Sequence, residues 1–285
     1  MNQRLFMSGF LAAALVSAPI WTPLSAQRQE ILLTERPWSG SVIRAAGGPV
    51  IPIFDGWYDN PDGTYSLCFG YYTMNSEEDF GIPLGPNNFI EPSQYDGWQP
   101  DYFEHIPESP FRYRRRYCVF SVQVPESFGP EDRVVWTLQR DRAEPLSVPG
   151  WLIPSYRLDE LESPGRGDTA PGLRLQENGP EGRGRNGISA GPVRARVGEP
   201  LELTVWVDHP ESEVWVGWAK HQGPADVSFS EQNTMVDPDS RTATTAATFN
   251  EPGEYLVRVQ SIDNPVAAFE FFCCWTNGYL EVTVE

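Results

Sequence analysis

Proline and glycine interrupt this chain so often that long helices are excluded. The 285 residues include 27 prolines and 25 glycines. A proline inside a helix removes a backbone hydrogen bond and clashes with the preceding turn, and an interior glycine destabilises a helix through its conformational freedom. The segments between these residues are short and rich in β-branched and aromatic side chains, which is typical of strands. The chain is therefore predicted to be all-β.

Four strand-like runs lie in the N-terminal half. They are Val50 to Tyr58, Thr64 to Thr73, Tyr113 to Val124 and Arg133 to Leu138. The first two are separated by Asn60-Pro61-Asp62-Gly63. Because proline presets one turn angle and glycine allows a positive φ, this sequence predicts a hairpin. Short strands with frequent turns predict an immunoglobulin-like β-sandwich over residues 27–162.

The first 26 residues have the features of a cleavable secretory signal. Arg4 gives a positive start, an apolar run extends from Leu5 to Ile20, and small residues lead to Ala26. The run is shorter than the roughly 20 residues of a permanent membrane span, and no later segment is apolar enough to cross a membrane. We expect cleavage after Ala26 and an exported protein of 259 residues (285 − 26), periplasmic or extracellular.

The charge of the chain disfavours a nucleic-acid partner. The formal net charge is −18 at pH 7, whereas phosphate binding depends on a concentrated positive surface. One basic run stands out, from Arg112 to Arg116. It could hold an anionic ligand such as an acidic polysaccharide, or it could pair with the acidic residues that precede it. The intramolecular pairing is the favoured interpretation.

A change in composition predicts the boundary between two domains. From residue 163 to residue 191, Pro, Gly, Arg and Glu dominate and no apolar periodicity is visible, so this segment is predicted to be an interdomain linker. Leu173 and Leu175 alternate with polar residues, which would place part of it on a domain surface. Residues 192–285 then contain seven strand-like runs: 194–197, 201–207, 214–220, 226–229, 242–249, 254–262 and 279–284.

Two aromatic residues predict an immunoglobulin-like sandwich for residues 192–285. Trp218, in phase with Val214 and Val216, stands where such folds place a core tryptophan on their third strand. Tyr255 opens the sixth strand and is predicted to form a tyrosine corner, in which its hydroxyl bonds to upstream backbone. Val257 replaces the cysteine of antibody domains, so their inter-sheet disulfide is missing.

Three segments carry a resemblance to a known class of domain. Arg196 to Leu203, Ala246 to Phe249 and Pro252 to Tyr255 resemble a bacterial PKD-like or immunoglobulin-like domain over residues 192–285. The whole chain is similar to uncharacterised exported bacterial proteins with a terminal Cys-Cys-Trp-Thr-Asn segment, here Cys273 to Asn277. The resemblance implies adhesion, spacing or partner binding, and it supplies no catalytic residues.

The four cysteines are expected to form disulfides in an oxidising compartment. The simplest pairing joins Cys68 to Cys118 and leaves Cys273 and Cys274 together or free. In a seven-strand sandwich, the loop that holds His209 lies at the same end as the loop that holds the adjacent cysteines. Two thiolates and an imidazole would suit copper or zinc. The alternative is a vicinal disulfide that shapes the loop.

Aromatic residues suggest a second kind of site, in the N-terminal domain. Trp57, Tyr58, Trp98 and Tyr102 lie within one stretch of the sequence. Exposed aromatic rings stack on sugars, which would make these four residues a carbohydrate platform. The alternative is that they fill the core of a small sandwich.

The sequence favours a non-enzymatic role, because no catalytic constellation is recognisable. The leading hypothesis is an exported binding or structural protein with a protein or glycan partner and no cofactor. One alternative is a metal-binding or thiol-redox module at Cys273, Cys274 and His209. The other is a carbohydrate-binding accessory protein.

Overall fold

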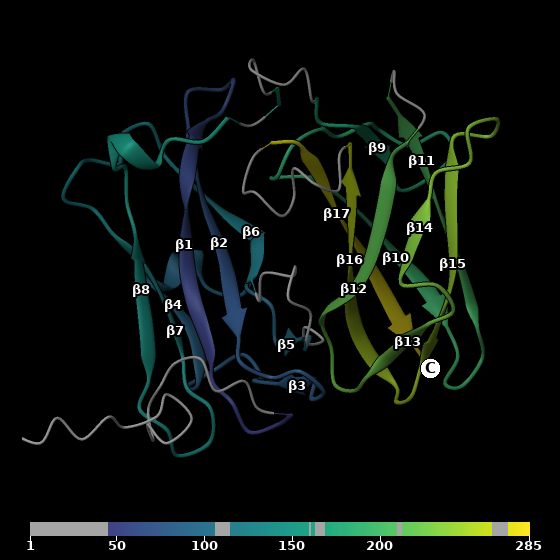
Figure 1. Ribbon diagram of the computed structural model, residues 1–285, viewed down its shortest axis with the longest axis horizontal. Helices are drawn as coiled ribbons and strands as arrows, with labels where there is room; N and C mark the ends of the chain where they lie inside the picture. Colours follow the sequence, from purple (N-terminus) through teal and green to yellow (C-terminus); the bar gives the residue numbers. More distant parts are fainter. Residues whose placement is uncertain (1–44, 106–114, 160, 163–168, 210–212, 264–272) are drawn as a thin grey trace, which may run out of the picture. The chain divides into compact units, whose positions relative to one another are not determined.

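Strands account for nearly all regular structure in the part of the chain that the structure describes (Figure 1). The structure is a computed structural model, and it describes residues 45–105, 115–159, 161–162, 169–209, 213–263 and 273–285. The predicted signal sequence, residues 1–26, lies outside the described residues. All described residues belong to one unit of the chain, Ile43–Glu285. Helical structure among them is limited to two short 3-10 turns, Ser93–Tyr95 and Pro154–Tyr156. The prediction of an all-β fold is confirmed.

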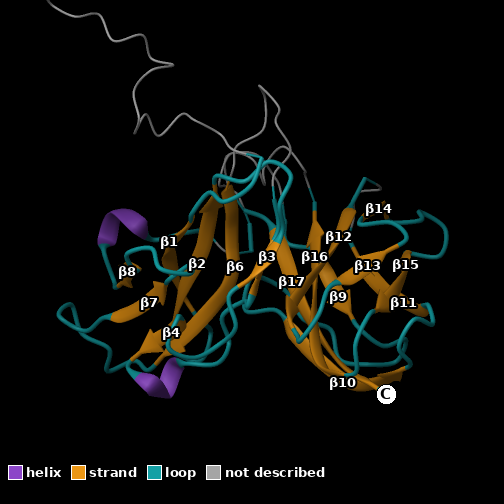
Figure 2. Ribbon diagram, turned by 90° about the horizontal axis from the view of Figure 1, so that it is seen from below, coloured by secondary structure: helices purple, strands orange, loops and turns teal. Residues whose placement is uncertain are grey.

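The N-terminal sandwich is built from two three-stranded sheets (Figure 2). The first has the order β1-β2-β6 and the second β4-β7-β8, with a small β3-β5 pair beside them. Phe69, Phe120 and Trp136 are fully buried at the centre of the core. The Phe69 and Phe120 rings are stacked with centroids 5.5 Å apart, and Trp136 meets Phe120 edge-on at 5.0 Å. The strands are β1 (Val50–Asp59), β2 (Tyr65–Thr73), β3 (Phe80–Gly81), β4 (Asn88–Glu91), β5 (Tyr102–Phe103), β6 (Arg115–Val124), β7 (Val134–Leu138) and β8 (Leu146–Gly150).

The hairpin predicted at residues 60–63 is present between β1 and β2. The amide of Asn60 donates a hydrogen bond to the Thr64 carbonyl at 2.9 Å, and that of Gly63 donates to the Asn60 carbonyl at 3.0 Å. Gly63 has a φ of 86°, which a residue with a side chain rarely adopts. The turn sequence alone therefore determined this connection.

The C-terminal sandwich packs a five-stranded sheet, β10-β17-β16-β12-β14, against a four-stranded sheet, β13-β15-β11-β9. Trp218 lies in its core with 1% of its surface exposed, as predicted. The Tyr255 hydroxyl donates a hydrogen bond to the Glu251 carbonyl at 2.9 Å, so the predicted tyrosine corner is formed. The strands are β9 (Gly172–Arg174), β10 (Ile188–Ala195), β11 (Leu201–Asp208), β12 (Trp215–Gln222), β13 (Val227–Phe229), β14 (Asn233–Met235), β15 (Thr242–Phe249), β16 (Gly253–Ile262) and β17 (Trp275–Val284).

One strand, β9, lies inside the range 163–191, for which the sequence predicted a linker, and a second, β10, begins in it. β9 pairs with β11, and β10 begins at Ile188 and pairs in parallel with β17. The reason is apolar burial, because Leu173 and Leu175 are buried in the core of the C-terminal sandwich. Leu173, Leu175 and Ile188 are too few, in a segment rich in Pro and Gly, to show a strand period in the sequence.

Candidate functional site

The predicted disulfide between Cys68 and Cys118 is formed. It joins the neighbouring strands β2 and β6, and both residues are fully buried against Tyr58 and Trp275. If side chains alternated strictly along β2 and β6, Cys68 and Cys118 would point to opposite faces of the sheet. The register between β2 and β6 shifts between Phe69 and Tyr71, and Cys118 has a φ of 42°. The irregularity turns Cys118 toward Cys68, on the face opposite the Phe69 core.

Cys273 and Cys274 form a disulfide with each other, and both are buried beside Ala170. The vicinal disulfide that the sequence left open as an alternative is thus what the structure contains. His209 is also buried, with its Nε2 atom 2.9 Å from the Thr169 hydroxyl and 3.4 Å from Asp263 Oδ2. Among the described residues, no group of three or more His, Cys, Asp or Glu side chains could hold a metal ion. A copper or zinc site here stays a prediction that requires reduced cysteines.

Trp57 and Tyr58 do not lie on a surface where sugars could stack. Trp57 is 9% exposed and donates from Nε1 to the Ile153 carbonyl at 2.7 Å. Tyr58 is 1% exposed, and its hydroxyl donates to Asn186 Oδ1 at 2.9 Å. Trp57 and Tyr58 therefore cannot be part of the predicted carbohydrate platform. Both rings are buried because β1 is covered on both faces, which the sequence of one strand cannot show.

Trp98 and Tyr102 lie apart from Trp57 and Tyr58, against the C-terminal sandwich. The Trp98 ring packs on Tyr279 with centroids 5.1 Å apart and keeps 36% of its surface exposed. Tyr102 is half-buried, with Lys220 Nζ 4.6 Å from its ring centroid. The structure therefore does not bring the four predicted aromatic residues into one site.

A pocket of about 510 Å³ lies beside β1, and five charged side chains are among its lining residues. Strand β1 contributes Ile53, Phe54 and Asp55 to its lining. The segment that follows β8 contributes residues 155–159. Arg115, Arg185 and Cys273 complete the lining from three distant parts of the sequence. This pocket is the candidate functional site.

A β-bulge in β1 shapes this pocket. The register with β2 shifts between Phe54 and Gly56, so Asp55 is the extra residue of the strand. Gly56 has a φ of 142°, and a Cβ at that position would clash with the Tyr156 carbonyl and the Leu158 side chain. Glycine here allows the segment 155–158 to lie directly against β1. An acidic residue followed by glycine within an apolar run was the sequence signal for this bulge.

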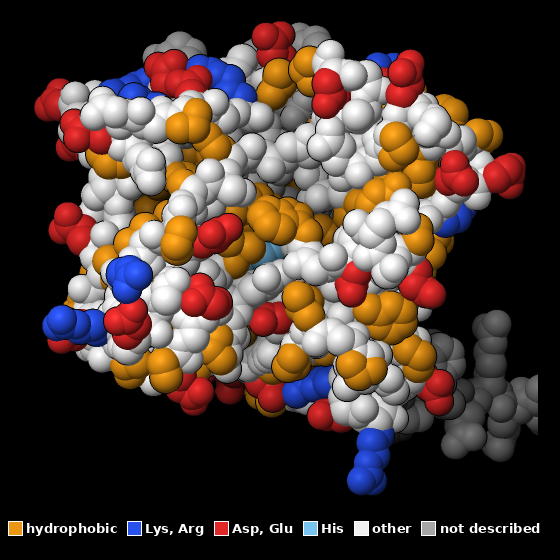
Figure 3. All heavy atoms as spheres, turned by 180° about the vertical axis from the view of Figure 1, so that it is seen from behind, with side chains coloured by type: hydrophobic (Ala, Val, Ile, Leu, Met, Phe, Trp, Pro, Cys, Tyr) orange, Lys and Arg blue, Asp and Glu red, His pale blue; other side chains and the backbone are white. Residues whose placement is uncertain are grey.

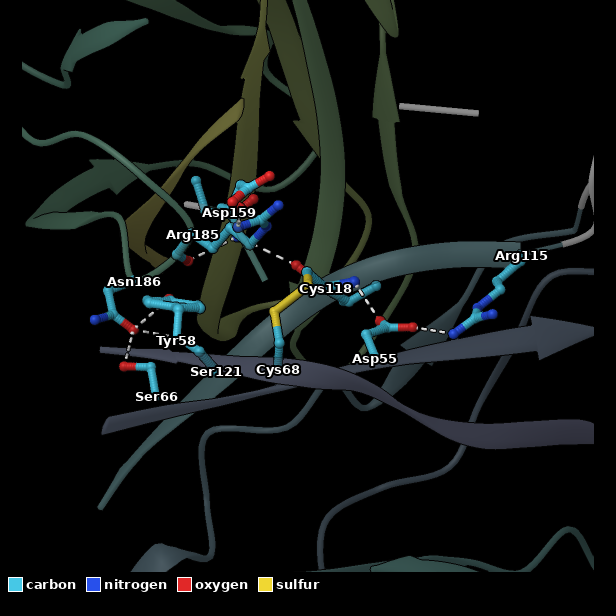
Figure 4. The surroundings of a disulfide bond; sticks show 12 residues. Asp55, Tyr58, Ser66, Cys68, Arg115, Cys118, Ser121, Asp159, Arg185 and Asn186 are labelled. Carbon is cyan, nitrogen blue, oxygen red and sulfur yellow. Dashed lines mark hydrogen bonds and ion pairs between the residues drawn. A yellow bond between two sulfur atoms is a disulfide. The ribbon is translucent and has the colours of Figure 1, made fainter. Parts of the chain in front are cut away.

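Asp55 is held in the pocket by two residues of β6, Arg115 and Cys118 (Figure 4). Its Oδ2 accepts a hydrogen bond from the Cys118 amide at 2.6 Å, and its Oδ1 forms an ion pair with Arg115. Burial raises the pKa of Asp55 to about 6, and the neighbouring Arg115 opposes this rise only in part. A buried carboxyl of this kind is typical of functional sites, although structural ion pairs also shift pKa values.

Arg185 forms the inner wall of the pocket. Only 1% of its surface is exposed, and its Nη1 donates to the Asp159 carbonyl at 2.6 Å. Its guanidinium lies over the Trp275 ring, 4.5 Å from the centroid. At the outer side, Arg157 forms an ion pair with Asp59 at 2.5 Å and is well exposed. The pocket thus has a fixed inner end and an open polar rim.

Two arginines of the basic run that begins at Arg112 are described by the structure, and they have different acidic partners. Residues 112–114 lie outside the described residues. Arg115 pairs with Asp55, and Arg116 lies 3.6 Å from Glu104. The favoured pairing with the preceding acidic segment holds for Arg116. Arg115 pairs with Asp55 at the bulge of β1, and Glu108 of the acidic segment lies outside the described residues.

The Cys-Cys-Trp-Thr-Asn segment leads into β17, which begins at Trp275, and its side chains contact the N-terminal sandwich. Trp275 packs against the Cys68–Cys118 disulfide. Asn277 Nδ2 donates to the Cys118 carbonyl at 3.3 Å, and the Tyr279 hydroxyl donates to the Val119 carbonyl at 3.1 Å. All three side chains are fully buried. The segment therefore has a structural function, which holds β17 against β6 next to the pocket.

The surface agrees with the acidic composition. On the face shown in Figure 3, acidic side chains are scattered over the surface, and apolar side chains gather in the hollow at its centre. No helix in the described part of the chain is long and apolar enough to cross a membrane.

Comparison with known proteins adds only a distant likeness of fold. No family model and no curated protein matches the chain. Among solved structures, the D0-D1 domain of intimin is similar at 10% identity and a TM-score of 0.25, over 82% of this chain and 97% of that one. The D00-D0 domain of intimin gives 9% and 0.27, over 82% and 100%. The I9-I11 tandem of titin gives 7% and 0.19, over 83% and 66%. These likenesses are too low to transfer a function to this chain.

Proposed function

We propose that this chain is an exported, non-enzymatic binding protein and that its ligand occupies the pocket lined by Asp55, Arg115 and Arg185. The observation that carries the proposal is the cavity of about 510 Å³ in which these charged side chains converge. Ligand sites of proteins have volumes of roughly 300 to 1,000 Å³ and a few placed polar groups. Export rests on the predicted signal sequence.

The rigidity of the pocket supports a binding role. Asp55 and Arg185 are held by hydrogen bonds to backbone groups, and a disulfide fixes the adjacent strands. A preorganised site loses little conformational entropy when a ligand binds. The buried junction between β17 and β6 supports the same interpretation, because it holds parts of both sandwiches in place around the site.

A pocket-filling substitution tests the proposal. Ser155 lines the pocket and is exposed, so Ser155→Trp would fill the cavity without disturbing the core. Ser93 is an exposed residue of the other 3-10 turn, and Ser93→Trp is the matched control. Melting temperatures of the three proteins would be measured with a panel of sugars, organic acids, amino acids and nucleotides.

The proposal expects at least one compound to stabilise the wild type and Ser93→Trp but not Ser155→Trp. Equal stabilisation of Ser155→Trp by every active compound would place binding elsewhere and overturn the proposal. So would a panel in which no compound stabilises the folded wild type.

A further inference from the structure

We infer that the ligand of this pocket is a sugar ring that stacks on Tyr156. The inference rests on the proposed function and names the class of ligand. It replaces the aromatic platform predicted from Trp57 and Tyr58 with a residue that the sequence did not single out. Two features carry it, an exposed aromatic wall and a rim that combines donors with acceptors.

Tyr156 supplies the aromatic wall. It lines the pocket, and 47% of its surface is exposed. Its ring stacks on Phe54 with centroids 6.0 Å apart and planes 22° apart, and Phe54 stacks in turn on Trp151 at 6.2 Å. Because Phe54 covers one face of the Tyr156 ring, we infer that the exposed area includes the other face. A supported ring with one open face offers an apolar surface at a low cost in side-chain entropy.

The backbone around Tyr156 is also fixed. The Tyr156 amide donates to the Ile153 carbonyl at 2.9 Å, and the Leu158 amide donates to the Trp57 carbonyl at 2.8 Å. The first bond closes the 3-10 turn and the second ties the segment to β1. The platform is therefore anchored to the sheet and is not carried by a free loop.

The polar groups of the pocket are balanced in charge. Its lining has three guanidinium groups (Arg115, Arg157, Arg185) and two carboxylates (Asp55, Asp159), and Arg157 also pairs with Asp59. The lining alone has one net positive charge, and with the Asp59 carboxylate that pairs with Arg157 outside it the sum is zero. The pocket therefore lacks the excess of positive charge that a strongly anionic ligand would need. Sugar hydroxyls both donate and accept hydrogen bonds, and carboxylates and guanidinium groups match both functions.

Glycan binding with three variants tests the assignment. The probes are cellohexaose, xylohexaose, maltohexaose, mannohexaose, chitohexaose and trigalacturonate, measured by isothermal titration calorimetry on residues 27–285. Tyr156→Ala removes the platform, and Tyr156→Phe keeps the ring without the hydroxyl. Trp98→Ala removes the other aromatic residue that is exposed in the described part of the chain, which lies against Tyr279 and does not line the pocket.

The expected result is that at least one probe binds and that Tyr156→Ala weakens it about tenfold or more, since ring stacking of this kind is worth on the order of one factor of ten in affinity. Tyr156→Phe and Trp98→Ala should bind within about twofold of the wild type, inside measurement error. Loss on Trp98→Ala with retention on Tyr156→Ala would overturn the assignment. Absence of binding to all six probes would do the same.

The two proposals fail in different ways. If a compound other than a sugar stabilises the wild type and Ser155→Trp abolishes its effect, the binding function stands and the sugar assignment falls. If every active compound, sugars included, acts equally well on Ser155→Trp, both fall together.

Discussion

Asn277 Nδ2 donates a hydrogen bond to the carbonyl of Cys118, a residue 159 positions earlier in the chain. The same amide group donates to the Arg185 carbonyl at 2.9 Å. One fully buried side chain thus satisfies two backbone acceptors, one on β6 and one next to the pocket. These two hydrogen bonds explain why the Cys-Cys-Trp-Thr-Asn segment ends in asparagine. A hydrophobic residue at this position could not donate to the Cys118 and Arg185 carbonyls.

Removing the Asn277 amide should destabilise the protein strongly. Asn277→Ala leaves two buried acceptors unsatisfied, and each such group costs roughly 1 to 3 kcal/mol. We expect the free energy of unfolding, measured in urea by tryptophan fluorescence, to fall by about 2 to 4 kcal/mol. Asn87→Ala, at an exposed asparagine, is the control and should change it by less than about 0.5 kcal/mol. Equal effects of the two substitutions would show that the junction is unimportant.

The two disulfides should differ in their contribution to stability. Cys68 and Cys118 are separated by 50 residues, and closing a loop of that length in the unfolded chain is worth about 4 kcal/mol in the chain-entropy model. Cys273 and Cys274 are adjacent and close no loop. We therefore expect Cys68→Ser/Cys118→Ser to lower the free energy of unfolding by several times more than Cys273→Ser/Cys274→Ser. Similar losses in urea titrations of the two double variants would contradict this account.

Asp55 should make the protein less stable as the pH rises. Its pKa rises from 3.8 to about 6 on folding, so the folded state binds its proton more tightly than the unfolded state. The stabilising contribution is complete below pH 3.8 and is lost as the pH rises through 6. The unfolding free energy of the wild type minus that of Asp55→Asn should fall by about 2 to 3 kcal/mol from pH 3.5 to pH 7. A difference that stays constant or increases would be inconsistent with a buried carboxyl.

His221 should have the opposite pH dependence in the same range. Its Nε2 donates to the Trp98 carbonyl at 2.9 Å, and burial lowers its pKa from 6.5 to about 3. The folded state therefore holds the neutral ring, and stability present above pH 6.5 is lost as the pH falls toward 3. Relative to His221→Gln, the wild type should lose about 3 kcal/mol between pH 7 and pH 4. Urea titrations at the two pH values check this, and an unchanged difference would mean that His221 titrates normally.

Much of the fold could be predicted because short-range patterns determine it. The frequency of proline and glycine excluded long helices, and the turn sequence ending at Gly63 predicted a hairpin. The alternation of apolar and polar residues around Trp218 predicted a core strand. The strands that the prediction missed, such as β9, are short. β9 is three residues long and is held by the burial of Leu173, which depends on a sheet formed by distant parts of the chain.

The candidate site could not be assembled from the sequence. Its residues lie at 53–55, 115, 155–159, 185 and 273, and only the folded sheets bring them together. Tyr156 lies in a segment without periodicity, whereas Trp57 belongs to an apolar run with two further aromatic residues, Phe54 and Tyr58. Exposure distinguishes the two residues, since Tyr156 is 47% exposed and Trp57 9%, and exposure is a property of the tertiary structure.

The central claim is that the pocket beside Asp55 binds the ligand, and hydrogen–deuterium exchange tests it most directly. Exchange would be measured on residues 27–285, with and without the compound that most stabilises the wild type. The account predicts that the compound slows exchange in residues 53–55, 115–118 and 155–159, and that Ser155→Trp abolishes this protection. Protection confined to other parts of the chain, with these three segments unchanged, would contradict it.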